Sequence, residues 1–196
     1  MKIYDVVIIG SGGAGMMAAL TAAKAGRSCI VLEKGKHLSV SNAARAGGPS
    51  LADTLLQEKE KCTVTAETMF RHMYAFSRGT VDGGLLYRCI RNGRKAEALL
   101  TESGIHMRLT EDLYHAGFRA RHFFDTPAPE RWERLGKKLT EYGGELVLGT
   151  CAKELLAENG RVCGVAAENT ADGRMVSYHE RAVVIASVGY QRNKEM

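Results

Sequence analysis

The sequence predicts an α/β fold with a parallel central sheet, helices on one face and a small β-meander on the other. An apolar strand-like run at 3–9 is followed by a helix that begins at Gly12 or Gly13 and by a second apolar strand at 28–33. Strand, helix and strand within about thirty residues are typical of a β–α–β unit of a parallel sheet. From Gly144 onward the pattern changes to strands, with a hairpin signal at Asn159-Gly160.

The composition is that of a globular protein with enough apolar surface for a core. The 196 residues are 45% hydrophobic and 25% charged, which suits one domain of ordinary size. The net charge of +5 comes from basic residues that alternate with acidic ones, so no nucleic-acid partner is expected. Five cysteines without a CxxC pair indicate a reducing compartment, and we expect a cytoplasmic protein without a membrane span or metal site.

Between the two strand-rich parts, apolar stripes at helical spacing predict three helices, at 65–77, 85–102 and 130–142. A long glycine- and serine-rich loop at 34–50 precedes them, and loops of this length are usually functional or disordered. The irregular segment between the second and third helices holds the candidate proton donors and anion binders, although a plain surface loop explains them as well: His115, Arg119, Arg121, His122 and Asp125. The strands after Gly144 include an edge strand and an apolar strand at 182–186.

The first strand ends in a glycine turn that fits the pattern GxGxxG at Gly10, Gly12 and Gly15. In such a turn the first glycine permits the sharp bend, and the second lets the backbone approach a pyrophosphate. The third lets the helix pack closely on the strand. The amides at the start of the helix then face the phosphates, as does the positive end of the helix.

An acidic residue ends the second strand at the distance that this turn requires. Glu33 follows Gly12 by 33 − 12 = 21 residues, where a carboxylate can accept hydrogen bonds from a ribose diol. A carboxylate disfavours a 2′-phosphate, so NADP is not expected. The turn and Glu33 together predict a Rossmann-like FAD/NAD(P)-binding fold that holds an adenine dinucleotide.

Several motifs resemble the flavoproteins of the fumarate reductase and succinate dehydrogenase group. They are "IIGSGGAGMMAALTAAKAG", "VLEKGKHLSVSNAARAGG", "GTCAKELLAENGRVCGV" and the return strand "AVVIASVGYQRNKEM". The resemblance implies FAD as the cofactor. It implies contacts to FAD from Gly10, Ser11, Gly12, Gly13, Ala14, Gly15, Glu33, Lys34, Ser41, Asn42, Ala46, Gly47, Gly48, Ala152, Ala186, Ser187 and Gly189.

Two positions depart from the pattern of that group. Some members attach FAD through a histidine seven residues before the second glycine of the Gly47-Gly48 pair. Here that position is 48 − 7 = 41, which is Ser41, so the resemblance implies non-covalent FAD. Val188 stands in the return strand where the group has a glycine, which adds a side chain beside the expected cofactor.

The resemblance also implies an incomplete protein. Residues 1–196 correspond to the N-terminal portion of an FAD-binding domain, and we expect the capping domain and the C-terminal FAD-binding segment to be absent. The expected function is an FAD-dependent oxidoreductase that transfers hydride from reduced flavin to an activated alkene, or the reverse, on a small-molecule substrate. The catalytic residues are not assigned, and this portion is not expected to turn over alone.

Two alternatives remain open. In the first alternative, the chain is a non-catalytic dinucleotide-binding or partner-binding module that self-associates through surface left uncovered by truncation. In the second alternative, it is an NAD-binding dehydrogenase domain. The long loop with Gly47-Gly48 and the late hairpin argue against the second alternative.

Overall fold

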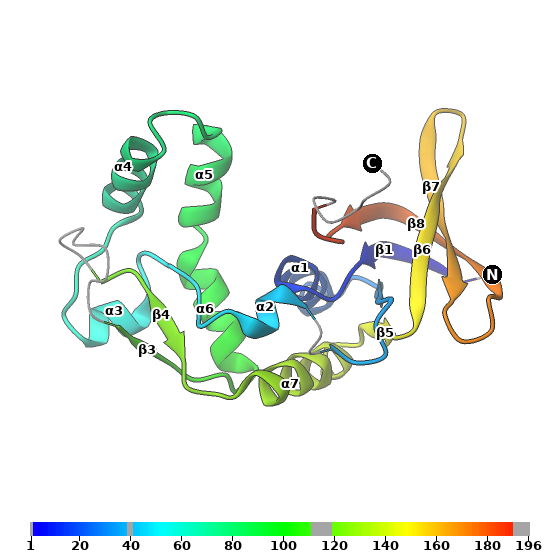
Figure 1. Ribbon diagram of the computed structural model, residues 1–196, viewed down its shortest axis with the longest axis horizontal. Coiled ribbons are helices and arrows are strands. Elements are labelled where there is room, and N and C mark those ends of the chain that lie inside the picture. Colours follow the sequence, from blue (N-terminus) through cyan, green and yellow to red (C-terminus); the bar gives the residue numbers. More distant parts are fainter. Residues whose placement is uncertain (1, 39–40, 111–118, 190–196) are drawn as a thin grey trace. The chain divides into compact units, whose positions relative to one another are not determined.

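The computed structural model describes residues 2–38, 41–110 and 119–189 (Figure 1). The chain divides into two compact units. The first comprises Met1–Arg45 and Ala128–Met196, and the second comprises Ala46–Pro127. The assignment of residues 1–196 to one FAD-binding domain therefore stays a prediction.

The first unit is built on a six-stranded sheet. Its strand order is β5 (Glu145–Val147), β2 (Cys29–Leu32), β1 (Ile3–Ile9), β8 (Met175–Ile185), β7 (Arg161–Asn169) and β6 (Thr150–Glu158). The pairs β5–β2, β2–β1 and β1–β8 are parallel, whereas β8–β7 and β7–β6 are antiparallel. The predicted mixed fold with a mostly parallel central sheet is confirmed.

The two faces of this sheet are covered by different kinds of structure. Side chains alternate along a strand, so Cys29 and Ile30 point to opposite faces. The Cys29 thiol lies 3.6 Å from the carbonyl of Ala19 in α1 (Gly13–Lys24), and α7 (Ala128–Glu141) packs on α1. On the other face, Val165 of β7 belongs to the same buried cluster as Ile30. The meander therefore packs on the face opposite the helices, as the sequence predicts.

One long strand replaces the expected pair of strands near the end of the chain. The first part of β8, Met175 to His179, pairs with β7. The part from His179 to Ile185 pairs with β1 (Figure 1). Because one partner takes over where the other ends, the chain stays extended through residues at which the sequence suggested a break.

The hairpin prediction is confirmed at Asn159-Gly160. Asn159 has φ 50° and Gly160 has φ 77°, and the two residues join β6 to β7. Two consecutive positive φ angles are those of the type I′ turn that suits a twisted hairpin.

The second unit contains short helices and a two-stranded sheet. Its elements are α3 (Leu55–Lys59), α4 (Ala66–Phe76), α5 (Gly83–Ile90), α6 (Gly93–Glu102), β3 (Met107–Leu109) and β4 (His122–Phe124). Thr54, Thr65 and Asp82 begin helices by accepting a hydrogen bond from a first-turn amide. In the described ranges of both units, no helix is long and apolar enough to cross a membrane.

The single helix expected at 85–102 is wrong. The chain forms α5 and α6, with a break at Arg91 and Asn92. The Asn92 side chain donates to the carbonyl of Arg88, and a Cβ on Gly93 would lie 2.5 Å from the carbonyl oxygen of Ala52. The start of α6 is thus fixed by close packing on a distant segment, which the apolar periodicity does not reveal.

Candidate cofactor-binding site

Two glycines of the turn after β1 are required by the packing of the protein itself. Gly10 has φ 98°, and a Cβ there would lie 2.7 Å from the carbonyl oxygen of Ala186. A Cβ on Gly15 would lie 1.9 Å from the carbonyl oxygen of Gly10. These contacts let α1 start directly against the ends of β1 and β8.

Gly12 is different, because no described residue requires a glycine there. Its φ of −63° suits any residue, and among the described residues a Cβ would approach the Ser41 side chain, at 4.0 Å. Gly12 is also the N-cap of α1, and no side chain caps the helix by a hydrogen bond. Uncapped first-turn amides beside open space fit an anionic group such as a pyrophosphate. The residues present therefore fit a dinucleotide.

Glu33 and Ser11 form a buried hydrogen-bonded pair beside this turn. Ser11 is fully buried and Glu33 is 7% exposed. The amide of Ser11 donates to Glu33 Oε2 at 2.8 Å, its hydroxyl donates to the same atom at 2.6 Å, and the amide of Gly35 donates to Oε1 at 2.7 Å. Burial favours a higher pKa for Glu33, but these hydrogen bonds outweigh it and lower the pKa.

The loop after β2 brings a second segment to the turn. Ser41 begins the short helix α2 (Asn42–Arg45) by accepting from the amide of Ala44 at 3.3 Å. Buried Arg131 of α7 donates to the carbonyl of Ala44 at 3.0 Å, which holds α2 in place. Lys34 and Asn42 are exposed. Arg131 was not predicted from the sequence, because it lies beside the apolar residues of α7 and its pattern does not indicate a contact with α2.

The return strand lies directly against the glycine turn. The amide of Ala186 donates to the carbonyl of Ile9 at 2.9 Å, and Ser187 and Gly189 follow on the surface. Val188 has φ 70° and is 70% exposed. A left-handed conformation is unfavourable for a β-branched residue and suits glycine, so this position is strained as valine.

Ala152 lies in β6, where it pairs with Ala167 and packs on the buried cluster of the first unit. The strand pairing is irregular between Ala152 and Glu154. Such an irregularity turns backbone groups away from the ladder, which is the property that a backbone contact to a base requires.

The predicted segment Ala46, Gly47 and Gly48 belongs to the second unit and lies along β4. The amide of Phe124 donates to the carbonyl of Gly47 at 2.8 Å, and a Cβ on Gly48 would lie 1.7 Å from the carbonyl oxygen of His122. A Cβ on Gly47 would lie 2.7 Å from the ring of Phe123 in β4, so close packing on β4 accounts for both glycines. A role of this segment toward the flavin remains a prediction.

The candidate acids in the irregular segment are occupied by structural contacts. His122 is fully buried, with Nδ1 2.9 Å from the Ala120 carbonyl and Nε2 2.8 Å from the Thr54 hydroxyl. A carbonyl can only accept, so Nδ1 carries the proton and Nε2 accepts from Thr54. Burial lowers the pKa of His122, which favours this neutral form.

The side chains of two further candidates, Arg119 and Asp125, form ion pairs. Arg119 forms an ion pair with Glu60 at 2.9 Å and donates to the carbonyl of Thr110 at 3.0 Å. Asp125 forms an ion pair with Arg108 at 2.9 Å. Arg121 pairs with Ser50 through the backbone, and His115 lies outside the described residues.

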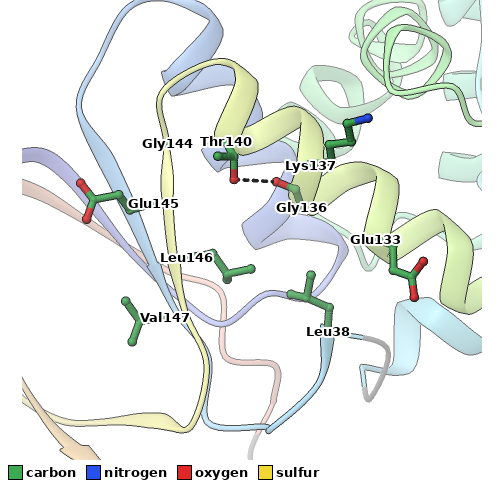
Figure 2. A pocket seen from close by; sticks show the side chains of 9 residues that line it. All are labelled: Leu38, Glu133, Gly136, Lys137, Thr140, Gly144, Glu145, Leu146 and Val147. Atoms are coloured by element: carbon green, nitrogen blue, oxygen red, sulfur yellow. Dashed lines mark hydrogen bonds between the residues drawn. The ribbon is translucent and has the colours of Figure 1, made fainter.

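The first unit also has a hollow of about 540 Å³ between α7 and β5 (Figure 2). Leu38, Leu146 and Val147 supply apolar surface, and Glu133 and Lys137 point from α7 (Figure 2). Thr140 of α7 uses its hydroxyl to donate to the carbonyl of Gly136 at 3.2 Å. None of the predicted cofactor residues lines this hollow.

The strand, the glycine turn, the uncapped helix and the buried carboxylate define a dinucleotide-binding α/β protein. The family is shown by a match of residues 5–196 to the family described as FAD binding domain. The chain belongs to this family, and FAD is its cofactor, as the resemblance to the fumarate reductase group implied.

The relatives that it matches include reductases and dehydrogenases, and this chain spans less than half the length of each of the following examples. A vinyl phenol reductase of Lactiplantibacillus plantarum is 27% identical over 195 residues, which are 98% of this chain and 39% of that protein. A urocanate reductase of Eggerthella lenta is 28% identical over 98% of this chain and 32% of that protein. The structure of a flavocytochrome c3 fumarate reductase in its open conformation matches with a TM-score of 0.79 at 22% identity, over 99% of this chain and 35% of that one.

Proposed function

We propose that this chain is the FAD-binding portion of an oxidoreductase that moves a hydride between flavin and an activated alkene. Relatives named for the reduction of vinyl phenol and urocanate, and one named NADH:fumarate oxidoreductase, support the proposal. All three named compounds contain a carbon–carbon double bond. When bound, FAD supplies the hydride chemistry, while the chain binds and orients it.

One observation carries the assignment of the cofactor site to this chain. The space at Gly12 is open and the first-turn amides of α1 have no side-chain cap, although the surrounding glycines are tightly packed. Gly12 and Gly13 would hold the pyrophosphate through their amides, Glu33 would accept from the ribose, and the backbone at Ala152 would meet the adenine. Ser41 cannot provide the covalent attachment that a histidine gives, so we propose non-covalent FAD.

The first test is the visible absorption spectrum of the purified 196-residue chain before and after acid precipitation. We expect a flavin spectrum whose chromophore stays in the supernatant. Chromophore in the pellet would overturn the non-covalent proposal. A colourless protein that does not take up added FAD would overturn the proposed function.

A matched variant separates binding from folding. Gly12→Ala places a methyl group in the open space without a clash with any described residue. We expect the thermal unfolding midpoint of the apoprotein to fall by only a few degrees, because alanine is a poorer N-cap than glycine, and FAD binding to fall by at least about tenfold. Unchanged binding would show that the phosphates do not lie at Gly12.

We also propose that residues 1–196 act as one portion of an FAD-binding domain and need further protein to turn over. His122 is buried, Arg119 and Asp125 form ion pairs, and the relatives named above are more than twice as long. Mixing the FAD-loaded chain with a chemical reductant and fumarate or urocanate should show no turnover above free FAD. We place the protein in a reducing compartment such as the cytoplasm, since all five cysteines are free.

A partner-binding module is the second candidate, and exposed apolar side chains favour it. Phe76 at the end of α4 is 85% exposed, and Leu85 in α5 is 62% exposed. Self-association through these residues predicts a dimer mass in light scattering that Phe76→Lys reduces to the monomer mass. A monomer at every concentration would remove this candidate.

A further inference from the structure

We propose that Ser11 is a positioning residue for the cofactor, whose hydroxyl holds the Glu33 carboxylate ionised and oriented toward the ribose. The inference rests on the proposed FAD-binding function and deepens it. It assigns to the side chain of Ser11 a role that the glycine-turn pattern leaves open, since that pattern allows any residue there.

The geometry makes Glu33 dependent on its donors. Its two oxygens offer about four acceptor positions, and three of them are taken by the Ser11 amide, the Ser11 hydroxyl and the Gly35 amide. Two donors on Oε2 and one on Oε1 fix the plane of the carboxylate. The remaining position on Oε1 is the one available to a ribose hydroxyl.

Burial determines what the hydroxyl does. Ser11 has no exposed surface and Glu33 is almost fully covered, so the carboxylate cannot replace a lost donor with water freely. The charged side chain that acts on Glu33 is that of its neighbour Lys34, which is exposed and lowers the pKa only as the smallest contribution. Removal of the Ser11 hydroxyl leaves burial, which favours the neutral acid, opposed by the two amides and Lys34.

The chain contains a matched control for this pair. Ser28 donates to Asp5 Oδ2 from its amide at 3.0 Å and from its hydroxyl at 3.1 Å. The donors to the carboxylate are the same as those from Ser11 to Glu33, and the Ser28 hydroxyl also accepts from the Asp5 amide at 2.9 Å. Ser28 is exposed, and it lies near the other end of the β1–β2 pair. Ser28→Ala therefore removes the same kind of bond away from the cofactor site.

The experiment is a flavin titration of the 196-residue apoprotein at several values from pH 5 to pH 8. It compares the unaltered chain with Ser11→Ala, Ser28→Ala, Glu33→Gln and the double variant Ser11→Ala/Glu33→Gln. We expect Ser11→Ala to weaken FAD binding about tenfold at pH 7, with a loss that grows as the pH falls. Ser28→Ala should stay within about twofold at each pH, and Ser11→Ala should have little further effect on Glu33→Gln.

Three outcomes would overturn the inference. Unchanged binding by Ser11→Ala would do so, as would a loss that is equal at every pH and persists on Glu33→Gln, because that is the sign of a general structural defect. Failure of the unaltered chain to bind FAD would overturn the proposed function together with the inference.

A second measurement depends neither on FAD nor on the folding of a variant. The Glu33 carboxyl is titrated by carbon-13 NMR in the unaltered apoprotein. We expect its pKa to lie below the ordinary glutamate value of 4.5, as the three donors require. A pKa above that value would show that burial prevails, and it would overturn the inference.

Discussion

A serine donates two hydrogen bonds to a carboxylate near each end of the β1–β2 pair, and the two serine–carboxylate pairs differ in burial. At one end the amide and hydroxyl of Ser11 donate to Glu33, and at the other the amide and hydroxyl of Ser28 donate to Asp5. Glu33 is 7% exposed, whereas the side chain of Asp5 is 27% exposed. In both serine–carboxylate pairs, one residue lies in β1 or shortly after it, and the other adjoins β2.

The difference shows how burial changes the meaning of a hydrogen bond. At Asp5, hydrogen bonds from Ser28 lower the pKa with little opposition from burial. At Glu33, burial is the largest influence and the donors must overcome it before the pKa falls. Water can replace a lost partner of Asp5, but the partners of Glu33 must come from the protein or the cofactor. The proposed role in cofactor binding therefore rests on the buried pair, Ser11 and Glu33.

Disrupting the contact between Gly15 and Gly10, near the buried Ser11–Glu33 pair, should have the largest effect on stability. Gly15→Ala puts a methyl group 1.9 Å from the carbonyl oxygen of Gly10, and neither backbone segment can move without separating α1 from the strands. We expect a loss of more than about 4 kcal/mol in the free energy of unfolding, measured by urea denaturation.

Gly26→Ala is the matched variant near the exposed Ser28–Asp5 pair. Gly26 has φ 72° and open space around it, so we expect a cost of only about 1 kcal/mol. Equal losses in the two variants would show that the close contact at Gly15 does not decide its stability.

Removal of the buried acid comes next in size. Glu33→Ala leaves the Ser11 amide, the Ser11 hydroxyl and the Gly35 amide without their acceptor, and we expect a loss of about 3 kcal/mol in urea denaturation. Asp5→Ala should cost less, because its donors reach water. A larger loss for Asp5→Ala would contradict the role assigned to burial.

The acid dependence of stability should distinguish the two serines. The lowered pKa of Glu33 means that its contribution is complete above the ordinary value of 4.5 and disappears as the pH falls through the lowered value. Ser11→Ala should make this acid-dependent loss smaller and complete it at a higher pH, because the pKa of Glu33 rises toward its ordinary value. Unfolding free energies from pH 3 to pH 7 measure the change, and an acid dependence equal to that of the unaltered chain would contradict the prediction.

The smallest expected change is a gain in stability at Val188, in the return strand beside the glycine turn. Val188→Gly removes a β-branched side chain from a residue with φ 70°, and we expect about 1 kcal/mol of stabilisation after the entropy of glycine is counted. Differential scanning calorimetry of the apoprotein measures it. A lower unfolding midpoint would show that the exposed valine makes a contact worth more than its strain.

The sequence predicts the parts of this molecule that depend on local pattern. The β–α–β unit, the glycine turn and the hairpin at Asn159-Gly160 follow from periodicity and turn chemistry. Contacts between distant segments do not follow from such patterns. The break before Gly93 depends on the close contact between Gly93 and Ala52. The length of β8 depends on its pairing with β1.

The same limit applies to the candidate site. The spacing from Gly12 to Glu33 identified the carboxylate, but it could not show that Ser11 is buried against it. His122 looked like a proton donor because of its residue type. Its burial between Thr54 and Ala120 is a property of the folded second unit, and no neighbouring residue in the sequence signals it.

The pairing of β1 with β8 also has a consequence for the order of events during synthesis. Ile3 pairs with His179, a separation of 179 − 3 = 176 residues. At ribosomal rates this interval takes on the order of 10–35 s. During this interval β2 is the described partner of β1 that is already present. Ser11 and Glu33 are only 22 residues apart, so the loop that their hydrogen bond closes is short and costs little entropy. The same hydrogen bonds are therefore available to hold β1 and β2 in register before β8 has been synthesised.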